Sequence, residues 1–351
     1  MKNAVLNVTP LTAPWSGADP FLFCAYHLDH YPASDGDMGV PAEALGGRPL
    51  GSDFSRKNGF SMYHSERVPG FPVHPHRGFE TVSFVRKGFV DHADSLGATA
   101  RYGAGDVQWL TTGSGVQHAE MFPLLNEDKG NDLELFQIWL NLPARNKFAE
   151  PEFKMLWAEQ IPVWRNVQGD NEQAVNDVTV IAGAFKPADG EVIVPPSPPK
   201  KSWAADEANK LALWSIRLSA GQRLTLPVEP DAGVMRMLYV YEADTFRVAD
   251  QQLSGKTQVE LSASASVEIE NTGEGLLQIM LMQAKPIGEP VAAHGPFVMN
   301  NEAELHQAFA DYRRTQFGGW SWPSNGPVHS ADSGRFARYP GSSVDDRPPV
   351  K

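Results

Sequence analysis

Between residues 59 and 142, short apolar and polar runs alternate and are broken repeatedly by glycine. Residues 78–90 alternate side chains with a period of two up to a Lys87-Gly88 step, which predicts a β-hairpin. Residues 98–122 predict several strands with glycines at the turns, and residues 133–142 predict a dense apolar strand that Pro143 stops. Strands that follow one another without helices between them indicate a small closed barrel or a sandwich.

The second half of the chain repeats this pattern with little identity of sequence. A new series of short strands begins near Ala212, and the Pro-Pro-Ser-Pro-Pro run at residues 195–199 predicts a stiff linker before it. Residues 147–162 predict a short helix or an irregular connection. Residues 300–317 predict a helix, because Asn301 can cap its start and apolar side chains recur at helical spacing. The tail after this helix is expected to wrap the surface or fray.

We therefore expect an all-β protein with two barrels and a C-terminal helix. Its expected parts are an N-terminal barrel with an entry segment (1–145), a connecting segment with the linker (146–210), a C-terminal barrel (211–300), and the helix and tail (301–351).

Composition and charge exclude several classes of function. The 351 residues carry a formal net charge of −12 and no Lys/Arg cluster longer than a pair, which disfavours direct binding of nucleic acid. No apolar run approaches the roughly 20 residues that cross a bilayer, so no membrane partner is expected. The N-terminus has no secretory apolar region, and the one cysteine, Cys24, excludes an intramolecular disulfide. We expect a cytoplasmic protein.

Two pairs of ligand-type side chains carry the chemistry of this sequence. His74 and His76 are two residues apart, and so are His118 and Glu120. Because residues two apart share one face of a strand, each pair can offer both side chains to one ion. Three imidazoles and a carboxylate suit a divalent transition metal with positions left open for water or substrate. The types of ligand favour Fe(II) for oxygen chemistry but leave Mn, Ni, Cu and Zn as alternatives. The alternative to a metal site is that these four polar residues are unrelated.

Other polar residues receive more ordinary interpretations. Three side chains are expected to support the ligands by hydrogen bonds, each weighed evenly against an ordinary structural role: Glu80, Gln117 and Gln137. The remaining histidines of interest are expected to be structural or to lie at the edge of the site: His27 and His30 as structural residues, His64 near the rim of a pocket, and His294 as an anchor for the C-terminal segment.

At this point the sequence resembles a known family. The segments HPHRGFETVSFV, GDVQWLTTGSGVQHAEMF, LFQIWLNLP and HGPFVMN are similar, in this order, to the signatures of the pirin family of bicupins, over residues 60–315. The resemblance implies two cupin barrels, with iron held in the first by His74, His76, His118 and Glu120 and no metal in the second. The segments PPSPPKKSWA and GRFARYP suggest a longer bacterial-type member. The first 50 residues depart from the family pattern, and AYHLDHYP there could alter the choice of substrate.

The resemblance implies two alternative functions. Some pirins resemble quercetin 2,3-dioxygenases, which implies a metal-dependent oxidoreductase that cleaves a flavonol-like aromatic substrate with O2. In this reading Glu120 is a metal ligand and a catalytic base. Other pirins are regulators, which implies an iron-dependent, redox-sensitive protein that binds a transcriptional or metabolic partner protein. A purely structural metal is the third reading, which the open positions of the site disfavour.

Overall fold

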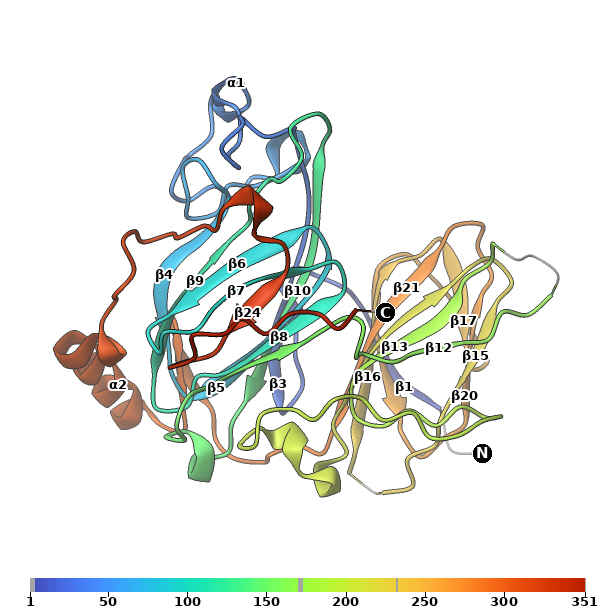
Figure 1. Cartoon of the computed structure of the whole chain (residues 1–351). Coiled ribbons are helices and arrows are strands. Elements are labelled where there is room, and N and C mark those ends of the chain that lie inside the picture. Colours follow the sequence, from blue (N-terminus) through green and yellow to red (C-terminus); the bar gives the residue numbers. More distant parts are fainter. Residues whose placement is uncertain (1–3, 170–172, 232, 351) are drawn as a thin grey trace. The chain divides into compact units, whose positions relative to one another are not determined.

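The computed structural model describes residues 4–169, 173–231 and 233–350 (Figure 1). Strands form most of the regular structure in this part of the chain, which confirms the predicted all-β class. Its two α-helices are α1 (Ala42–Leu45) and α2 (Glu302–Thr315). Among the described residues, no helix is both long and apolar enough to cross a membrane.

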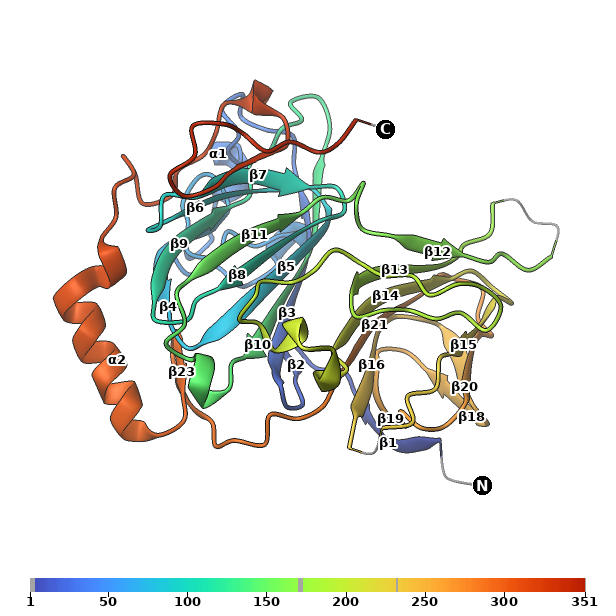
Figure 2. The ribbon, with the colours of Figure 1, turned by 60° about the horizontal axis from the view of Figure 1, so that its bottom comes forward.

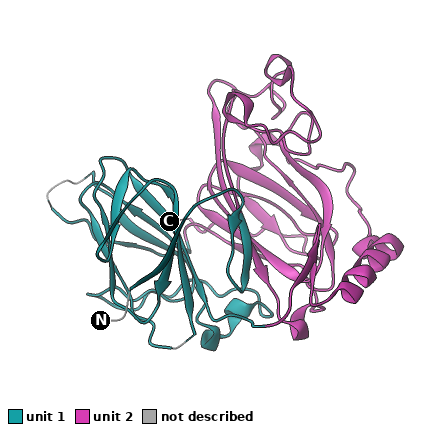
Figure 3. Cartoon of the chain, turned by 180° about the vertical axis from the view of Figure 1, so that it is seen from behind, with its two compact units in different colours: residues 1–24, 160–288 teal, residues 25–159, 289–351 magenta. Residues whose placement is uncertain are grey.

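Contacts divide the chain into two compact units (Figure 3). Unit 1 contains residues 1–24 and 160–288, and unit 2 contains residues 25–159 and 289–351. This division differs from the four consecutive parts expected from the sequence, because segments near both ends of the chain pair with distant strands. The proline-rich run at residues 195–199 correspondingly lies within unit 1 and does not separate the two units.

Two sheets build the barrel of unit 2. One has the strand order β11-β8-β5-β10-β3, and the other has the order β24-β7-β6-β9-β4. Their bounds are β3 (Phe21–Tyr31), β4 (Gly70–His76), β5 (Phe79–Lys87), β6 (Phe89–Asp94), β7 (Thr99–Gly103), β8 (Asp106–Thr111), β9 (Val116–Met121), β10 (Asn131–Asn141), β11 (Glu152–Leu156) and β24 (Phe336–Arg338). Strand β3 begins in unit 1, where it pairs with β2 (Trp15–Ser16). Unit 2 also contains a separate two-stranded sheet, in which β22 (Ala292–His294) pairs with β23 (Phe297–Met299).

Two predictions about unit 2 are wrong. β5 and β6 follow one another at Lys87-Gly88, but they do not form a hairpin, because β5 pairs with β8 and β10 whereas β6 pairs with β7 and β9. The turn residues indicated where the chain reverses, but not which sheet the next strand joins. Residues 152–156, expected to be helical or irregular, form strand β11 because they pair with the edge of β8.

The barrel of unit 1 also has two sheets, with the orders β1-β19-β16-β21-β14-β13-β12 and β15-β20-β17-β18. This confirms the second series of strands. Its core consists of aliphatic and aromatic side chains. Its strands are β1 (Val5–Pro10), β12 (Val163–Arg165), β13 (Asn176–Ala182), β14 (Ala212–Leu218), β15 (Arg223–Leu226), β16 (Met235–Glu242), β17 (Thr245–Val248), β18 (Gln251–Ser254), β19 (Thr257–Ser262), β20 (Val267–Asn271) and β21 (Leu277–Ala284).

The C-terminal helix and tail pack onto unit 2. Helix α2 has the predicted cap, since the side chain of Asn301 accepts a hydrogen bond from the Glu304 N–H. Its apolar stripe packs with Phe297 and Phe317, and two views show the helix beside β4 (Figures 1 and 2). The tail forms β24, which pairs with β7 and closes one edge of the sheet. The tail therefore packs as an ordered part of the unit.

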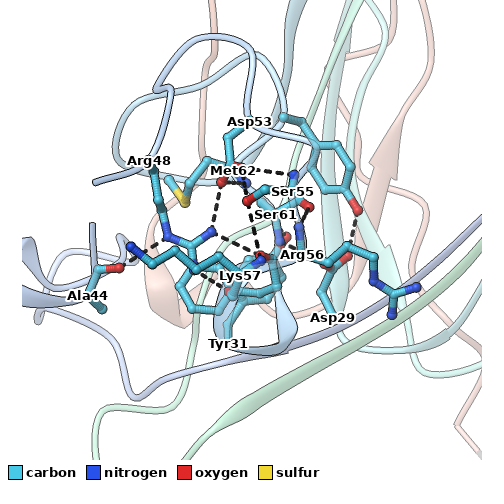
Figure 4. A network of polar contacts seen from close by, with 12 residues as sticks. Asp29, Tyr31, Ala44, Arg48, Asp53, Ser55, Arg56, Lys57, Ser61 and Met62 are labelled. Atoms are coloured by element: carbon cyan, nitrogen blue, oxygen red, sulfur yellow. Dashed lines mark hydrogen bonds and ion pairs between the residues drawn. The ribbon is translucent and has the colours of Figure 1, made fainter. Parts of the chain in front are cut away.

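A loop between β3 and β4 is held by a buried ion pair (Figure 4). Arg48 donates to the Asp53 carboxylate at 2.7 Å and to the Phe60 carbonyl at 3.0 Å, and both charged side chains are fully buried. Asp53 also accepts the Met62 N–H at 3.1 Å. Because this network fixes both ends of residues 48–62, it positions Tyr63 and the residues that lead into β4.

Candidate metal centre

The two ligand-bearing strands lie side by side, as their spacing predicted. β4 and β9 pair antiparallel, with His74 directly opposite His118. The register shifts between Phe71 and His74, so a bulge precedes the histidine pair. Pro75, which cannot donate to the ladder, lies opposite Gln117. Alternation along both strands then turns His74, His76, His118 and Glu120 to the same face of the sheet.

Three imidazoles converge within the barrel. Ring centres are 4.4 Å apart for His74 and His118, 4.8 Å for His74 and His76, and 4.9 Å for His76 and His118. One nitrogen from each ring lies within 4.8 Å of the others. Three nitrogens that share one ion at about 2.1 Å lie roughly 3.0–3.6 Å from one another. The three rings are therefore close to one another but would have to move inward, by up to about 1 Å, to share a cation.

Glu120 lies just outside this group of nitrogens. Its Oε2 atom is 3.7 Å from His118 Nε2. The carboxylate accepts hydrogen bonds from Gln137 Nε2 at 2.8 Å and from the Ser83 hydroxyl at 3.3 Å. These two donors come from β10 and β5, so the opposite sheet holds the carboxylate beside the imidazoles. Its position is compatible with a fourth ligand or with an acceptor for a proton next to the ion.

Burial sets the protonation of the group. It lowers the pKa of His74 to about 4 and holds the pKa values of His76 and His118 well below the usual range, where neighbouring imidazoles add to the effect. All three rings are therefore neutral at neutral pH and keep a lone pair for a metal. Burial also raises the pKa of Glu120, although His92, Gln137 and Ser83 oppose this shift.

The hydrogen bonds of the rings direct the remaining nitrogens. His74 Nδ1 is 2.9 Å from the Pro72 carbonyl, and His76 Nδ1 is 3.4 Å from the Pro296 carbonyl, which leaves Nε2 of each ring for an ion. In His118, which is fully buried, neither ring nitrogen has a hydrogen-bond partner. A buried polar atom without a partner is unfavourable, and a cation at His118 Nε2 would remove this penalty for one of the two. The donor set fits a divalent transition metal.

The three residues expected to support the ligands by hydrogen bonds differ in the partners they contact. Gln137 does contact a predicted ligand, Glu120. Glu80 accepts the Thr111 hydroxyl at 2.6 Å. Gln117 points to the opposite face of β9, where its amide donates to the Gln316 carbonyl at 2.7 Å and accepts the Tyr312 hydroxyl at 2.9 Å. It therefore connects a ligand-bearing strand to the C-terminal helix.

The other histidines contact hydroxyl, carboxylate or aromatic groups outside the cluster of three imidazoles. His27 Nδ1 is 2.8 Å from the Tyr63 hydroxyl, and His30 Nδ1 is 2.8 Å from Asp132. The His64 ring lies 5.6 Å from the ring of Phe71, which is in turn 6.3 Å from the ring of His74, so His64 is close to the edge of the site. On β22, the ring of His294 lies 5.6 Å from that of Phe309 on α2.

One histidine near the centre was missed by the sequence analysis. His92 on β6 lies opposite Glu120 on β9, and its ring centre is 5.6 Å from that of His118. His92 and Asp94 have the same two-residue spacing as the predicted ligands, which is a usable signal. The predicted hairpin of β5 and β6 does not bring β6 next to β9, so the spacing alone does not place His92 at the centre.

A strand barrel that gathers three imidazoles in its interior, in one chain with a second barrel of similar construction, defines a bicupin with a candidate metal centre. Family models support this class: Pirin matches residues 48–140, and the Pirin C-terminal cupin domain matches residues 213–318. The chain belongs to the pirin family.

Similar proteins carry two kinds of name. A protein of Pseudomonas aeruginosa named as a putative quercetin 2,3-dioxygenase is 33% identical over 297 residues, which cover 82% of this chain and 94% of that protein. Human pirin is 32% identical over 263 residues, which cover 74% of this chain and 81% of pirin. A crystal structure named quercetin 2,3-dioxygenase from Acinetobacter baumannii has a TM-score of 0.65 at 26% identity and covers 90% of this chain and 98% of its own.

Proposed function

We propose that this protein is a metal-dependent dioxygenase that cleaves a quercetin-like flavonol with O2. The observation that carries the proposal is the convergence of three neutral imidazoles, two of them buried and one partly buried, beside the Glu120 carboxylate. The names of the relatives in Pseudomonas aeruginosa and Acinetobacter baumannii support the same activity. In this reaction both oxygen atoms of O2 enter the products, and one ring carbon leaves as CO.

His74, His76, His118 and Glu120 would hold the metal, and Fe(II) is the ion we propose, with Mn, Ni, Cu or Zn as alternatives. A redox-active divalent ion supplies Lewis acidity and the electron exchange that reaction with O2 requires. The imidazoles bind as neutral ligands because burial keeps their pKa values low. Three protein nitrogens leave open positions, as a catalytic site needs and a structural site normally lacks.

Glu120 is the group that would take the proton from the substrate hydroxyl. Burial raises the pKa of this carboxyl, which makes it a better proton acceptor than an exposed glutamate. Gln137 and Ser83 donate to its two oxygens and hold it in position. If Glu120 also binds the metal, proton transfer requires that one of these oxygens be free of the ion.

The aromatic surroundings indicate the side from which a flat substrate enters. Of the three clustered histidines, His74 is partly exposed, whereas His76 and His118 are buried. The ring of Phe71 lies 6.3 Å from that of His74 and stacks on Tyr63 at 4.9 Å. Phe54, which is 53% exposed, lies 5.4 Å from Tyr63. These rings offer apolar faces to a planar polyphenol next to the accessible ligand.

The test is reconstitution of the metal-free protein with Fe(II), Mn(II), Co(II), Ni(II), Cu(II) or Zn(II), one at a time, followed by addition of quercetin and O2. We expect loss of flavonol absorbance and release of one CO per substrate with at least one redox-active ion. His118→Ala should lose this activity, whereas His306→Ala, a matched change on the exposed face of α2, should retain it. Absence of turnover with every metal would reject the dioxygenase.

A second candidate function is favoured by one observation. The outer face of the ligand-bearing strands is bonded to the C-terminal helix: Gln117 contacts Tyr312, and Arg77, next to His76, forms an ion pair with Asp311 at 2.9 Å. A change in the metal could therefore alter an exposed helix that a partner protein binds. If the protein is such a redox-sensitive regulator, partner capture should differ between the Fe(II) and Fe(III) forms; identical capture would exclude it.

A further inference from the structure

His92 and Asp94 form a buried pair behind the candidate metal centre. Both side chains are fully buried, and His92 Nε2 lies 3.1 Å from Asp94 Oδ2. The second oxygen of Asp94 accepts the backbone N–H groups of Leu96 and Ala98, each at 2.9 Å. A carboxylate fixed in this way accepts a hydrogen bond, so the geometry places a ring proton of His92 on Nε2. In the tautomer that carries only this proton, Nδ1 has a lone pair, and this buried atom has no partner.

The neighbouring histidine, His118, also has a buried nitrogen without a partner, and this nitrogen is expected to be a donor. His118 Nε2 lies 3.7 Å from Glu120 Oε2, and for this reason we assign Nε2 as the nitrogen that would bind the candidate ion. A neutral imidazole that gives its Nε2 lone pair to a metal carries its proton on Nδ1. That Nδ1 is also buried and also lacks a partner. The interior of the barrel thus contains an unpaired donor on His118 and an unpaired acceptor on His92.

The two rings are close enough to satisfy one another. Their centres are 5.6 Å apart, with an angle of 63° between the ring planes. The two Nδ1 atoms form no hydrogen bond as they stand. If the His118 ring turned so that its Nδ1 faced that of His92, the two nitrogens would lie about 3.2 Å apart, at the outer limit of a hydrogen bond. His92 cannot turn freely, because Asp94 holds one side of the ring and Phe153 stacks on it at 5.1 Å.

We propose that His92 is a positioning residue for the metal ligand His118, through a relay in which His118 Nδ1–H donates to His92 Nδ1 and His92 Nε2–H donates to Asp94. The inference rests on the metal site of the proposed function and adds residues that hold one of its ligands. The relay fixes the tautomer and the angle of His118 and strengthens it as a donor to the ion. Loss of a contact of this kind typically weakens metal binding by about 10- to 100-fold.

The first test locates the protons directly. Long-range proton–nitrogen spectra of the Zn(II)-loaded protein with ¹⁵N-labelled histidine distinguish the two tautomers of each ring. We expect the Nε2–H form of His92 and the Nδ1–H form of His118. A His92 ring that carries its proton on Nδ1 would overturn the relay. If Zn(II) changes none of the signals of His74, His76 and His118, the metal site itself fails, and that result is distinct from failure of the relay.

The second test uses substitutions with opposite hydrogen-bonding properties, read by competition of each variant with a chelator for Zn(II). His92→Phe removes the acceptor and should weaken Zn(II) binding about 10- to 100-fold. His92→Gln can accept the same hydrogen bond through its amide oxygen and should restore most of the affinity. Asp94→Asn should weaken binding as well, because an amide donor toward His92 Nε2 moves the ring proton to Nδ1, where it opposes the proton of His118.

Phe153→Leu is the matched control for packing. It loosens the ring that stacks on His92 without changing a hydrogen bond, so it should lower the melting temperature of the metal-free protein and leave Zn(II) affinity within about twofold. Wild-type affinity in a folded His92→Phe protein would reject the proposal. If His92→Phe does not fold, the comparison of His92→Gln with Asp94→Asn decides, since equal affinity in both would also reject it.

Discussion

The barrel of unit 2 has a polar interior around its histidines, whereas the core of unit 1 is mainly hydrocarbon, although it includes the buried side chains of Arg236 and Gln283. In unit 2, Ser83, Gln108 and Gln137 form hydrogen bonds within the barrel close to Glu120. In unit 1, Leu238, Val240 and many similar residues form one apolar cluster. The strands are arranged in much the same way, so the fold does not require the polar groups. If the candidate centre binds a metal as proposed, these polar groups would hold its ligands in position.

The two units also differ in their buried polar atoms that have no hydrogen-bond partner. Among the described residues, the buried side chains with an unpartnered nitrogen or oxygen are Thr81, His92, Gln108, Trp109 and His118 in unit 2 and Asn176 and Arg236 in unit 1. Such atoms destabilise a fold and persist mainly where they have another role. Unit 2, which contains the candidate metal centre, therefore has more of these unfavourable atoms than unit 1 among the described residues.

The largest expected effect is loss of the metal. His118→Ala should abolish detectable binding of Zn(II) or Fe(II), because two imidazoles and a carboxylate remain and the central buried ligand is gone. Leu238→Ala in unit 1 should leave metal binding unchanged. Calorimetric titration of both metal-free variants measures the difference. Retention of tight binding by His118→Ala would contradict the assignment of the centre to unit 2.

Next in size is the buried ion pair of unit 2. Arg48→Met leaves Asp53 buried without its counter-charge, which should destabilise the unit by about 3–5 kcal/mol. Denaturant unfolding, with fluorescence as the probe, measures the loss. Arg67→Met is the matched control: its ion pairs with Asp35 and Asp37 are exposed, and its removal should change stability by less than about 1 kcal/mol. Equal effects in the two variants would show that burial of the pair is unimportant.

Shortening a buried apolar side chain of unit 1 should lower the stability of the protein without affecting metal binding. Leu238→Ala deletes fully buried hydrocarbon from the core of unit 1 and should cost about 2–5 kcal/mol of the free energy of unfolding. Ser83→Ala in unit 2 removes only a hydroxyl and should cost about 1 kcal/mol, while it also loosens Glu120. Unfolding curves of the two variants test whether the apolar core of unit 1 contributes more to the free energy of unfolding than the Ser83 hydroxyl of unit 2 does. A larger effect of Ser83→Ala would reverse this conclusion.

The smallest effect concerns acid. Burial alone would raise the pKa of Asp53, but hydrogen bonds from Ser55, Arg48 and Met62 outweigh it and lower the pKa to about 2. Because this value is below the unfolded value of about 3.9, the contribution of Asp53 to stability is complete above about pH 4. It is lost as the pH falls through 2. Asp53→Asn should therefore be less stable than wild type at neutral pH, and the difference should shrink in acid unfolding experiments.

The sequence predicted local features of the site and missed the features that depend on sheet topology. The two-residue spacing in HPH and HAE is visible in the sequence, and it predicts that both side chains of each pair lie on the same face of a strand. His92 carries the same spacing to Asp94, but its relevance depends on the pairing of β6 with β9. Nothing near residue 92 in the sequence specifies that pairing, since it results from how two sheets share the strands of one barrel.

The division of the chain into units was hidden for a similar reason. β1 belongs with unit 1 because Val8 pairs with Val259, some 250 positions later. Residues 195–199 have the composition of a linker, yet they lie within one unit. Proline content reports local stiffness, whereas a boundary depends on contacts between distant segments. Helix α2, in contrast, was predictable because its cap and apolar stripe lie within one short stretch.

The last strand of the sheet has a consequence for biosynthesis. β24 closes the edge of the sheet that contains the candidate metal centre, and the Asn325 carbonyl accepts the N–H of Val73, the residue before a predicted ligand. During translation, residues 25–159 therefore emerge long before the segments that brace them. The strands of unit 1 are all made by residue 288 and can fold earlier. A chain that stops before residue 325 would therefore lack both contacts, and the candidate centre would be without these supports.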